Sequence, residues 1–214
     1  MKPELIKEQP PRRAAVPGDA ARGDCAPGDA AFGNTAWPVK QAVPTESCLQ
    51  AMLSNADFAD SYLLPDPCPE LGLLDSWLRL MGKTPAWMEA LMWLRNRVVR
   101  LFGLKDLGGM SRATQRKAAA DFRIGDRVGI FTLEAQHPQE LVLGDCDKHL
   151  HVRVSLLRLQ RDGLSRLALT TVVHEHNWLG RCYMALVGPV HSLIVPLHLR
   201  QLGRRLAADT RLRG

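Results

Sequence analysis

The 214-residue sequence lacks the short motifs that identify most enzymes. It contains no G-x-G-x-x-G or P-loop pattern for nucleotide phosphates, and no serine lies in a G-x-S-x-G nucleophile elbow. Its five cysteines are odd in number and form no C-x-x-C pair, which argues against a disulfide framework and favours a reducing compartment. We therefore expect no cofactor, and the motifs leave open whether the chain is an enzyme.

The apolar content predicts a soluble cytoplasmic protein. Hydrophobic residues make up 46% of the chain and charged residues 23%, which is typical of globular domains. No apolar signal-peptide core follows the first lysine. The segment Cys182–Leu199 carries no formal charge, but it is interrupted by prolines and is at the lower limit of membrane-spanning length. We expect it to belong to a soluble domain.

Basic residues are in excess, with a net charge of +6. They gather between Arg95 and Arg127 and again from Arg200 to Arg213. No nucleic-acid-binding motif accompanies them, so nucleic acid is an unlikely partner and a solvated surface is the simplest interpretation. The alternative is a weak association with an anionic membrane surface.

The first 43 residues are rich in Pro, Gly, Ala and Asp and hold few large apolar side chains. Such a segment gains too little burial to offset its chain entropy, so we predict a disordered tail over residues 1–43. A single domain is predicted over residues 44–206, followed by a basic tail at 207–214. Its N-terminal half shows signals for helices at Thr45–Leu53, Leu71–Met81 and Pro85–Phe102 and for a strand at Phe58–Leu64.

The C-terminal half alternates in the manner of β-strands and ends in a long helix. Strands are predicted at residues 127–135, 139–144, 149–161 and 164–175, and the helix at residues 179–206, kinked by Pro189 and Pro196. Its expected buried stripe is Cys182, Leu186, Val190, Leu193 and Leu197. This order predicts an α+β fold in which an antiparallel sheet packs against the terminal helix.

Asp162-Gly163 is a strong signal for a two-residue hairpin loop. Such a loop pairs Arg161 with Leu164 and gathers the apolar side chains of both strands on one face. The agreement between loop and alternation predicts this register.

The same register brings four histidines to the opposite face. His149 falls opposite His176, and His151 opposite His174, with Arg153 beside them. Neutral imidazoles in this pattern can bind a transition metal, although a polar sheet face with hydrogen-bonded histidines is the simpler interpretation and no metal is expected by default. In an enzyme, His149, Arg153 and His176 would be the candidate acid–base and anion-binding groups.

Several segments resemble a bacterial domain-of-unknown-function family, number 2867, from about Phe58 to Arg200. The resemblance is carried by Asp147–Ser155, Thr170–Asn177, Leu179–Tyr183 and Pro189–His191, with shorter pieces at Ala59–Tyr62, Leu94–Asn96, Phe102–Leu104 and Gly125–Gly129. The family is similar to the helix-grip, START-like group, which implies a curved antiparallel sheet around a C-terminal helix and an enclosed apolar cavity. His151 and His174 depart from the family pattern, which weakens the four-histidine metal site.

The resemblance favours a domain that binds a small apolar or amphipathic molecule between sheet and helix. The candidate ligand-binding residues are Val152, Val154, Leu169, Val173, Tyr183, Leu186, Val190 and His191. The alternative is a lyase, cyclase or hydrolase that uses the His149, Arg153 and His176 cluster in the same cavity.

Overall fold

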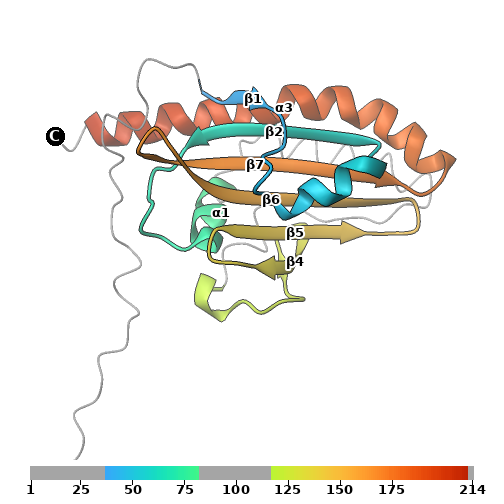
Figure 1. Cartoon of the computed structure of the whole chain (residues 1–214), viewed down its shortest axis with the longest axis horizontal. Helices are drawn as coiled ribbons and strands as arrows, with labels where there is room; N and C mark the ends of the chain where they lie inside the picture. The colour runs from blue at the N-terminus through green and yellow to red at the C-terminus, as the bar shows by residue number, and fades with distance from the viewer. Residues whose placement is uncertain (1–36, 82–116, 212–214) are drawn as a thin grey trace, which may run out of the picture.

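The computed structural model describes residues 37–81 and 117–211, with side chains as far as Gln201. Within these ranges, the strands form one antiparallel sheet in the order β1-β2-β7-β6-β5-β4-β3 (Figure 1). They are β1 Val39–Gln41, β2 Phe58–Pro65, β3 Arg127–Val128, β4 Phe131–Gln136, β5 Glu140–Cys146, β6 Leu150–Arg161 and β7 Leu164–Glu175. A long helix, α3 (Trp178–Arg211), follows the last strand, so the predicted α+β arrangement of sheet and C-terminal helix is confirmed.

The β6–β7 hairpin lies at the centre of the sheet and has the predicted register. Arg161 pairs with Leu164, and pairing continues without a shift as far as Leu150 and Glu175. Asp162 and Gly163 have φ of 54° and 73°, the left-handed pair that a two-residue type I′ turn requires.

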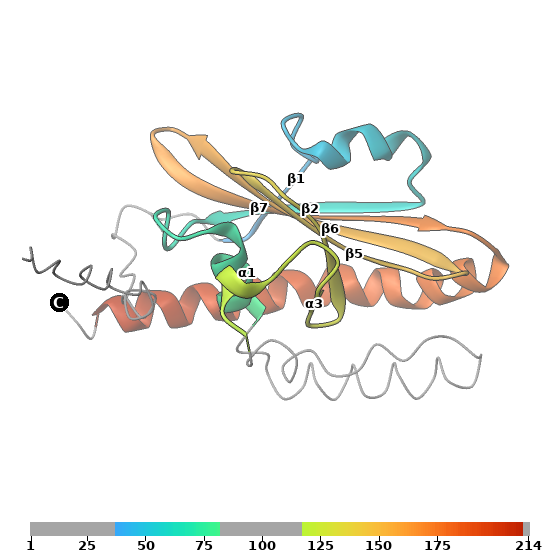
Figure 2. The ribbon, with the colours of Figure 1, turned by 90° about the horizontal axis from the view of Figure 1, so that it is seen from below.

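α3 lies along one face of the sheet, here called the inner face, and η3 (Cys48–Asn55) lies on the opposite, outer face (Figure 2). Alternation sends one set of strand side chains inward, where they form the main core. Its members include Tyr62, Leu64, Leu141, Leu143, Val154, Leu156, Leu167, Leu169 and, from α3, Leu199. Each fully buried leucine contributes about 1.5–3 kcal/mol of transfer free energy, so this core holds the layers together.

The outer face is closed by a smaller cluster and a buried carboxylate. Leu49 of η3 packs with Val142 and Val172. Glu140 accepts hydrogen bonds from Ser47 Oγ at 2.6 Å and from Cys48 N at 2.9 Å. Ser155 Oγ donates to the same carboxylate. Glu140 therefore anchors the start of η3 to the sheet.

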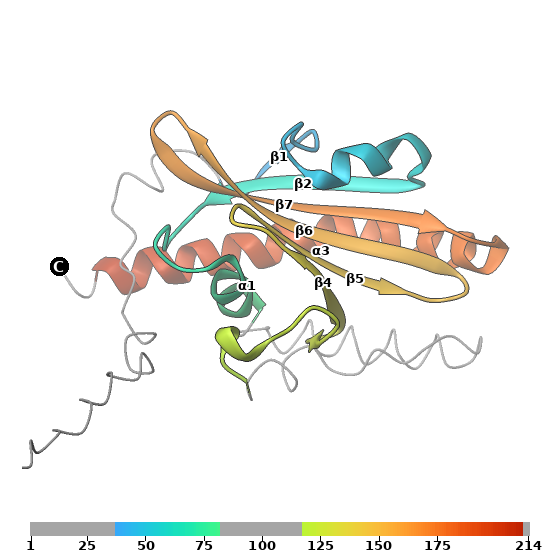
Figure 3. The ribbon, with the colours of Figure 1, turned by 60° about the horizontal axis from the view of Figure 1, so that its bottom comes forward.

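A second buried carboxylate joins the end of β2 to α1 (Leu73–Met81), which packs below the sheet on the same side as α3 (Figure 3). Arg158 Nε donates to Asp66 Oδ2 at 2.6 Å, and its Nη1 donates to Leu71 O at 2.9 Å. The Asp66 side chain has no solvent exposure, so this ion pair is an interior link between β6 and the turn before α1.

Three elements differ from expectation. β1 falls inside the segment predicted to be a disordered tail. The helix expected from Thr45 is the 3-10 helix η3, capped by Ser47, whose side chain accepts from Leu49 N. The strand expected at 127–135 is divided into β3 and β4 because Gly129 turns the chain with φ of 66°. The helix predicted at Pro85–Phe102 lies outside the described residues.

The predicted buried stripe of α3 is wrong, because those residues face outward. Leu186 and Leu193 are each 62% exposed, and Cys182 is also exposed. The opposite edge of the helix packs against the rest of the protein, and His198 and Leu199 are buried there. α3 is apolar on nearly every side, so periodicity could not identify the packed edge.

Two further findings bear on the compartment. Cys68 is disulfide-bonded, contrary to the expectation from cysteine spacing, so the cysteines no longer favour a reducing setting. Within the described residues, Trp178–Gln201 is long and apolar enough to cross a membrane, a test that core helices of soluble proteins also pass.

Candidate functional site

A buried carboxylate lies between the sheet and α3. Alternation along β2 turns Asp60 toward the inner face, opposite Thr171 of β7. Its side chain is only 2% exposed, and neither carboxylate oxygen accepts a well-formed hydrogen bond from the described residues. Burying a carboxylate without donors is costly, and such a group is a frequent mark of a functional site.

An imidazole from α3 lies beside this carboxylate. His191 Nδ1 lies 3.3 Å from Asp60 Oδ2, and the two form an ion pair when the ring is protonated. The ring packs edge-on against Phe58, with centroids 5.6 Å apart. The His191 side chain is 27% exposed, so it connects the buried Asp60 with the surface.

A phenol completes the cluster. Tyr62 is buried on β2, and its hydroxyl donates a long hydrogen bond of 3.5 Å to Ser192 O on α3. Burial, the negative charge of Asp60 and a hydrogen-bonding contact with that carboxylate raise the pKa of the Tyr62 phenol. Tyr62 therefore stays protonated at neutral pH and retains its donor. We call Asp60, Tyr62 and His191 the inner cluster.

The structure divides the predicted ligand-binding residues into two groups. Val152, Val154, Leu169 and Val173 lie on the inner face, and Tyr183 and His191 are half-buried on α3. Leu186 and Val190 are 62% and 42% exposed on the outward side of α3. These two side chains therefore do not lie between the layers, and the ligand-binding role of the residues remains a prediction.

The four predicted histidines lie near one another at the open end of the β6–β7 hairpin, but their side chains have separate partners. His151 and His174 are paired across the hairpin. His174 Nε2 lies 3.1 Å from Met52 O, His149 Nδ1 lies 3.2 Å from Asn177 Oδ1, and His176 Nδ1 lies 3.2 Å from Asp147 O. Within the described part of the chain, no three His, Cys, Asp or Glu side chains gather in a way that could hold a metal.

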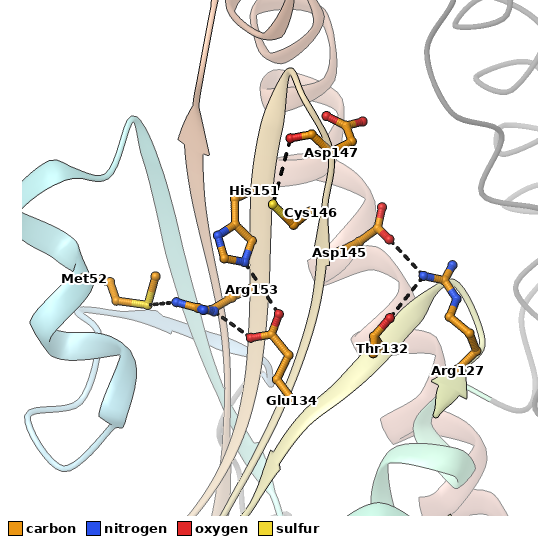
Figure 4. A network of polar contacts seen from close by, with 9 residues as sticks. All are labelled: Met52, Arg127, Thr132, Glu134, Asp145, Cys146, Asp147, His151 and Arg153. Carbon is orange, nitrogen blue, oxygen red and sulfur yellow. Dashed lines mark hydrogen bonds and ion pairs between the residues drawn. The ribbon is translucent and has the colours of Figure 1, made fainter. Parts of the chain in front are cut away.

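His151 belongs instead to a polar network on the outer face (Figure 4). The register of β4 against β5 shifts between Leu133 and Ala135, and the intervening Glu134 reaches across β5 to β6. There its carboxylate accepts from Arg153 Nε at 2.6 Å and lies 3.6 Å from His151 Nε2. Gly144 provides the space for this side chain, because a Cβ at position 144 would overlap the Glu134 carboxylate.

This network includes one of the candidate catalytic residues, Arg153. Arg153 is paired with Glu134 through Nε, and its Nη1 contacts Met52 Sδ at 2.9 Å. Burial and the Arg153 charge lower the pKa of His151, against a smaller opposing effect of Glu134. Figure 4 also shows the neighbouring pair Arg127–Asp145, at 2.9 Å. The outer network is therefore a structural link between β4 and β6.

His149 and His176 fix the start of α3. Asn177 Oδ1 accepts from Leu179 N at 3.1 Å and Gly180 N at 3.2 Å, which caps the helix, and it also contacts His149. Asp147 Oδ1 accepts from His149 N at 2.7 Å and orders the β5–β6 turn. A Cβ on Gly180 would lie 2.3 Å from His149 O, so only glycine allows this approach. These contacts give two segments that carry the family resemblance, Asp147–Leu150 and His176–Arg181, a structural role.

Of the candidate catalytic residues, Arg153 thus lies on the outer face and His149 and His176 lie at the start of α3, whereas the inner cluster lies between the sheet and the middle of α3. Asp60 and Tyr62 were not predicted as site residues. The available signal was alternation along β2, which puts both polar side chains on the same face as the apolar Leu64.

Comparison with known proteins gives one match. The model of a family described as protein of unknown function (DUF2867) matches residues 52–197. No curated protein and no solved structure shows significant similarity to the chain.

Proposed function

The chain belongs to this family of proteins of unknown function, and from the inner cluster we propose that it binds a small amphipathic molecule between the sheet and α3. The observation that carries the proposal is the buried Asp60 carboxylate, neither of whose oxygens accepts a well-formed hydrogen bond from the described residues, although Tyr62 and His191 lie beside it. A ligand hydroxyl or amine would supply such a hydrogen bond and offset the cost of burial.

The surroundings of Asp60 fit a ligand that is polar at one end. Val173 and Leu169 pair with Phe58 and Tyr62 of β2 on the inner face, which provides apolar contact for a hydrocarbon body. Tyr62 and His191 add hydrogen-bonding groups beside the carboxylate. Sites of this kind combine an apolar lining with a few placed polar groups.

The proposal can be tested with three probes of similar size: 2-phenylethylamine, 2-phenylethanol and phenylacetate. We expect the amine and the alcohol to raise the thermal unfolding midpoint, and the carboxylate to be rejected by the Asp60 charge. Asp60→Asn should abolish this preference. Glu134→Gln removes a carboxylate from the outer face and serves as the matched control. Equal shifts with all three probes, or a preference that survives Asp60→Asn, would contradict the proposal.

Acid–base catalysis at the inner cluster is the second candidate function. The contact between Asp60 and His191 favours it, because a carboxylate that orients a partly exposed imidazole is a common way to build a general base. His191 would take a proton from the substrate, and Asp60 would stabilise the imidazolium. A panel of hydrolase and lyase substrates, compared between wild type and His191→Gln, tests this role. Activity that is unchanged in the variant rules it out.

A further inference from the structure

The outward side of α3 is an uninterrupted apolar stripe. Trp178, Leu186, Val190, Leu193 and Leu197 are 69%, 62%, 42%, 62% and 40% exposed. They recur at intervals of three, four and eight residues and so share one side of the helix. With a rise of 1.5 Å per residue, the stripe is about 28 Å long. Apolar stripes of this length on a protein surface mark contact with another apolar phase or partner.

The opposite edge of α3 is fixed to the sheet. Tyr62 donates to Ser192 O, His191 faces Asp60, and His198 Nε2 lies 3.2 Å from Leu80 O on α1. Crossing a membrane would require the helix to give up these contacts. The geometry instead fits a helix that lies in the plane of an interface, with its inner edge on the protein and its outer stripe in the acyl region.

Charge identifies the surface that the stripe would meet. No acidic residue occurs between Trp178 and Gln201, whereas Arg181 in the first turn and Arg200 near the end are both exposed. An exposed tryptophan at one end and arginines at both ends are the groups that anchor helices at a lipid headgroup layer. Anionic headgroups would neutralise the arginines.

A second copy of the chain is a poorer occupant. In an antiparallel pairing of two α3 helices, Arg181 of one copy would approach Arg200 of the other, and a parallel pairing would place identical arginines together. Neither arrangement offers an acidic group from Trp178–Gln201 to balance them. Like charges across an interface oppose association.

We infer that α3 seats the protein on an anionic lipid bilayer through this stripe. The inference is independent of the proposed ligand, since it uses the side of α3 that faces away from Asp60. Full-length protein should co-sediment with vesicles of mixed phosphatidylserine and phosphatidylcholine, and much less with pure phosphatidylcholine. High salt should weaken the binding.

Two pairs of substitutions test the stripe against overall charge. Leu186→Glu with Leu193→Glu should abolish co-sedimentation. The control, Val39→Glu with Ile124→Glu, adds the same charge at exposed apolar positions on β1 and before β3, and it should retain most of the binding. Arg181→Gln and Arg200→Gln should each reduce partitioning roughly fivefold. Thermal unfolding of each variant checks that it is folded.

Three results would overturn the inference. The first is an absence of binding to the anionic vesicles. The second is equal loss in the stripe and control pairs, which would show that only net charge matters. The third is a dimer in solution that Leu186→Glu with Leu193→Glu dissociates while vesicle binding is absent, which would assign the stripe to a second copy.

Discussion

Asp60 and Asp66 are both buried beside β2, yet only Asp66 has a permanent counter-charge. A guanidinium nitrogen of Arg158 lies 2.6 Å from Asp66, whereas Asp60 faces the imidazole of His191 at 3.3 Å. The two carboxylates therefore have opposite effects on stability, and the first prediction compares them.

Asp60→Leu should raise the free energy of unfolding at neutral pH by about 1–3 kcal/mol, because it removes a buried charge and adds apolar contact. Asp66→Leu should lower it by about 3–5 kcal/mol, because Arg158, whose side chain is 14% exposed, loses its partner. Urea denaturation measures both. A loss of similar size in the two variants would mean that Asp60 is satisfied in the fold.

Glu140 should make stability depend on acid pH. Burial alone would raise its pKa, but the hydrogen bonds from Cys48 N, Ser155 and Ser47 hold the pKa below its ordinary value. Because the folded pKa is below the unfolded value near ~4.3, the stabilisation is complete above that pH and is lost as pH falls through the folded pKa.

Glu140→Gln should therefore lower the free energy of unfolding at neutral pH by about 1–3 kcal/mol, and the two stability curves should converge in acid. Chemical denaturation between neutral pH and acid follows this convergence. Glu46→Gln, which alters an exposed ion pair with Arg161, should leave the curve nearly unchanged. A constant gap between the wild-type and Glu140→Gln curves at every pH would contradict the role assigned to the charge.

Two glycines of α3 should respond oppositely to alanine. At Gly180 the new Cβ would meet His149 O, a backbone atom that cannot move aside, so Gly180→Ala should cost about 1–3 kcal/mol. At Gly188 the nearest atom is on Phe58 at 3.9 Å, an ordinary contact, so Gly188→Ala should gain about 0.8–1 kcal/mol from helix propensity. Thermal and urea unfolding would show the opposite signs. A tolerated Gly180→Ala would mean that α3 does not start against the β5–β6 turn.

The outer network predicts the direction of two titrations. Arg153→Gln removes a positive charge and should raise the pKa of His151, and Glu134→Gln removes a negative charge and should lower it further. NMR titration of the His151 ring measures both. Arg161→Gln changes an exposed charge elsewhere and should leave the His151 pKa unchanged. Shifts of the same sign in the first two variants would show that the three side chains do not interact as a network.

The centre of the sheet could be predicted because two local signals agreed there. Asp162-Gly163 selected the turn, and the alternation of β6 and β7 selected the same register. β1 had no such signal, since Val39–Gln41 is short and pairs only with β2.

The inner cluster could not be predicted as a site because it depends on long-range packing. Sequence alternation puts Asp60 on a strand face, but only the contact of α3 with that face brings His191 to it. The packed edge of α3 was also predicted wrongly. Its outer side chains are as apolar as its inner ones, so no periodic contrast separated them.

The pairing of β2 with β7 has a consequence for synthesis on the ribosome. Ser61 and Thr170, neighbours across these strands, are 109 residues apart in the chain. The edge of β2 that binds β7 must therefore stay unpaired while the ribosome makes everything between them, and until then only the short β1 can pair with β2. The β6–β7 hairpin closes through a local turn and can form as soon as it emerges. Productive folding thus begins near the C-terminus, and a chaperone that shields the nascent N-terminal half should raise the yield of folded protein.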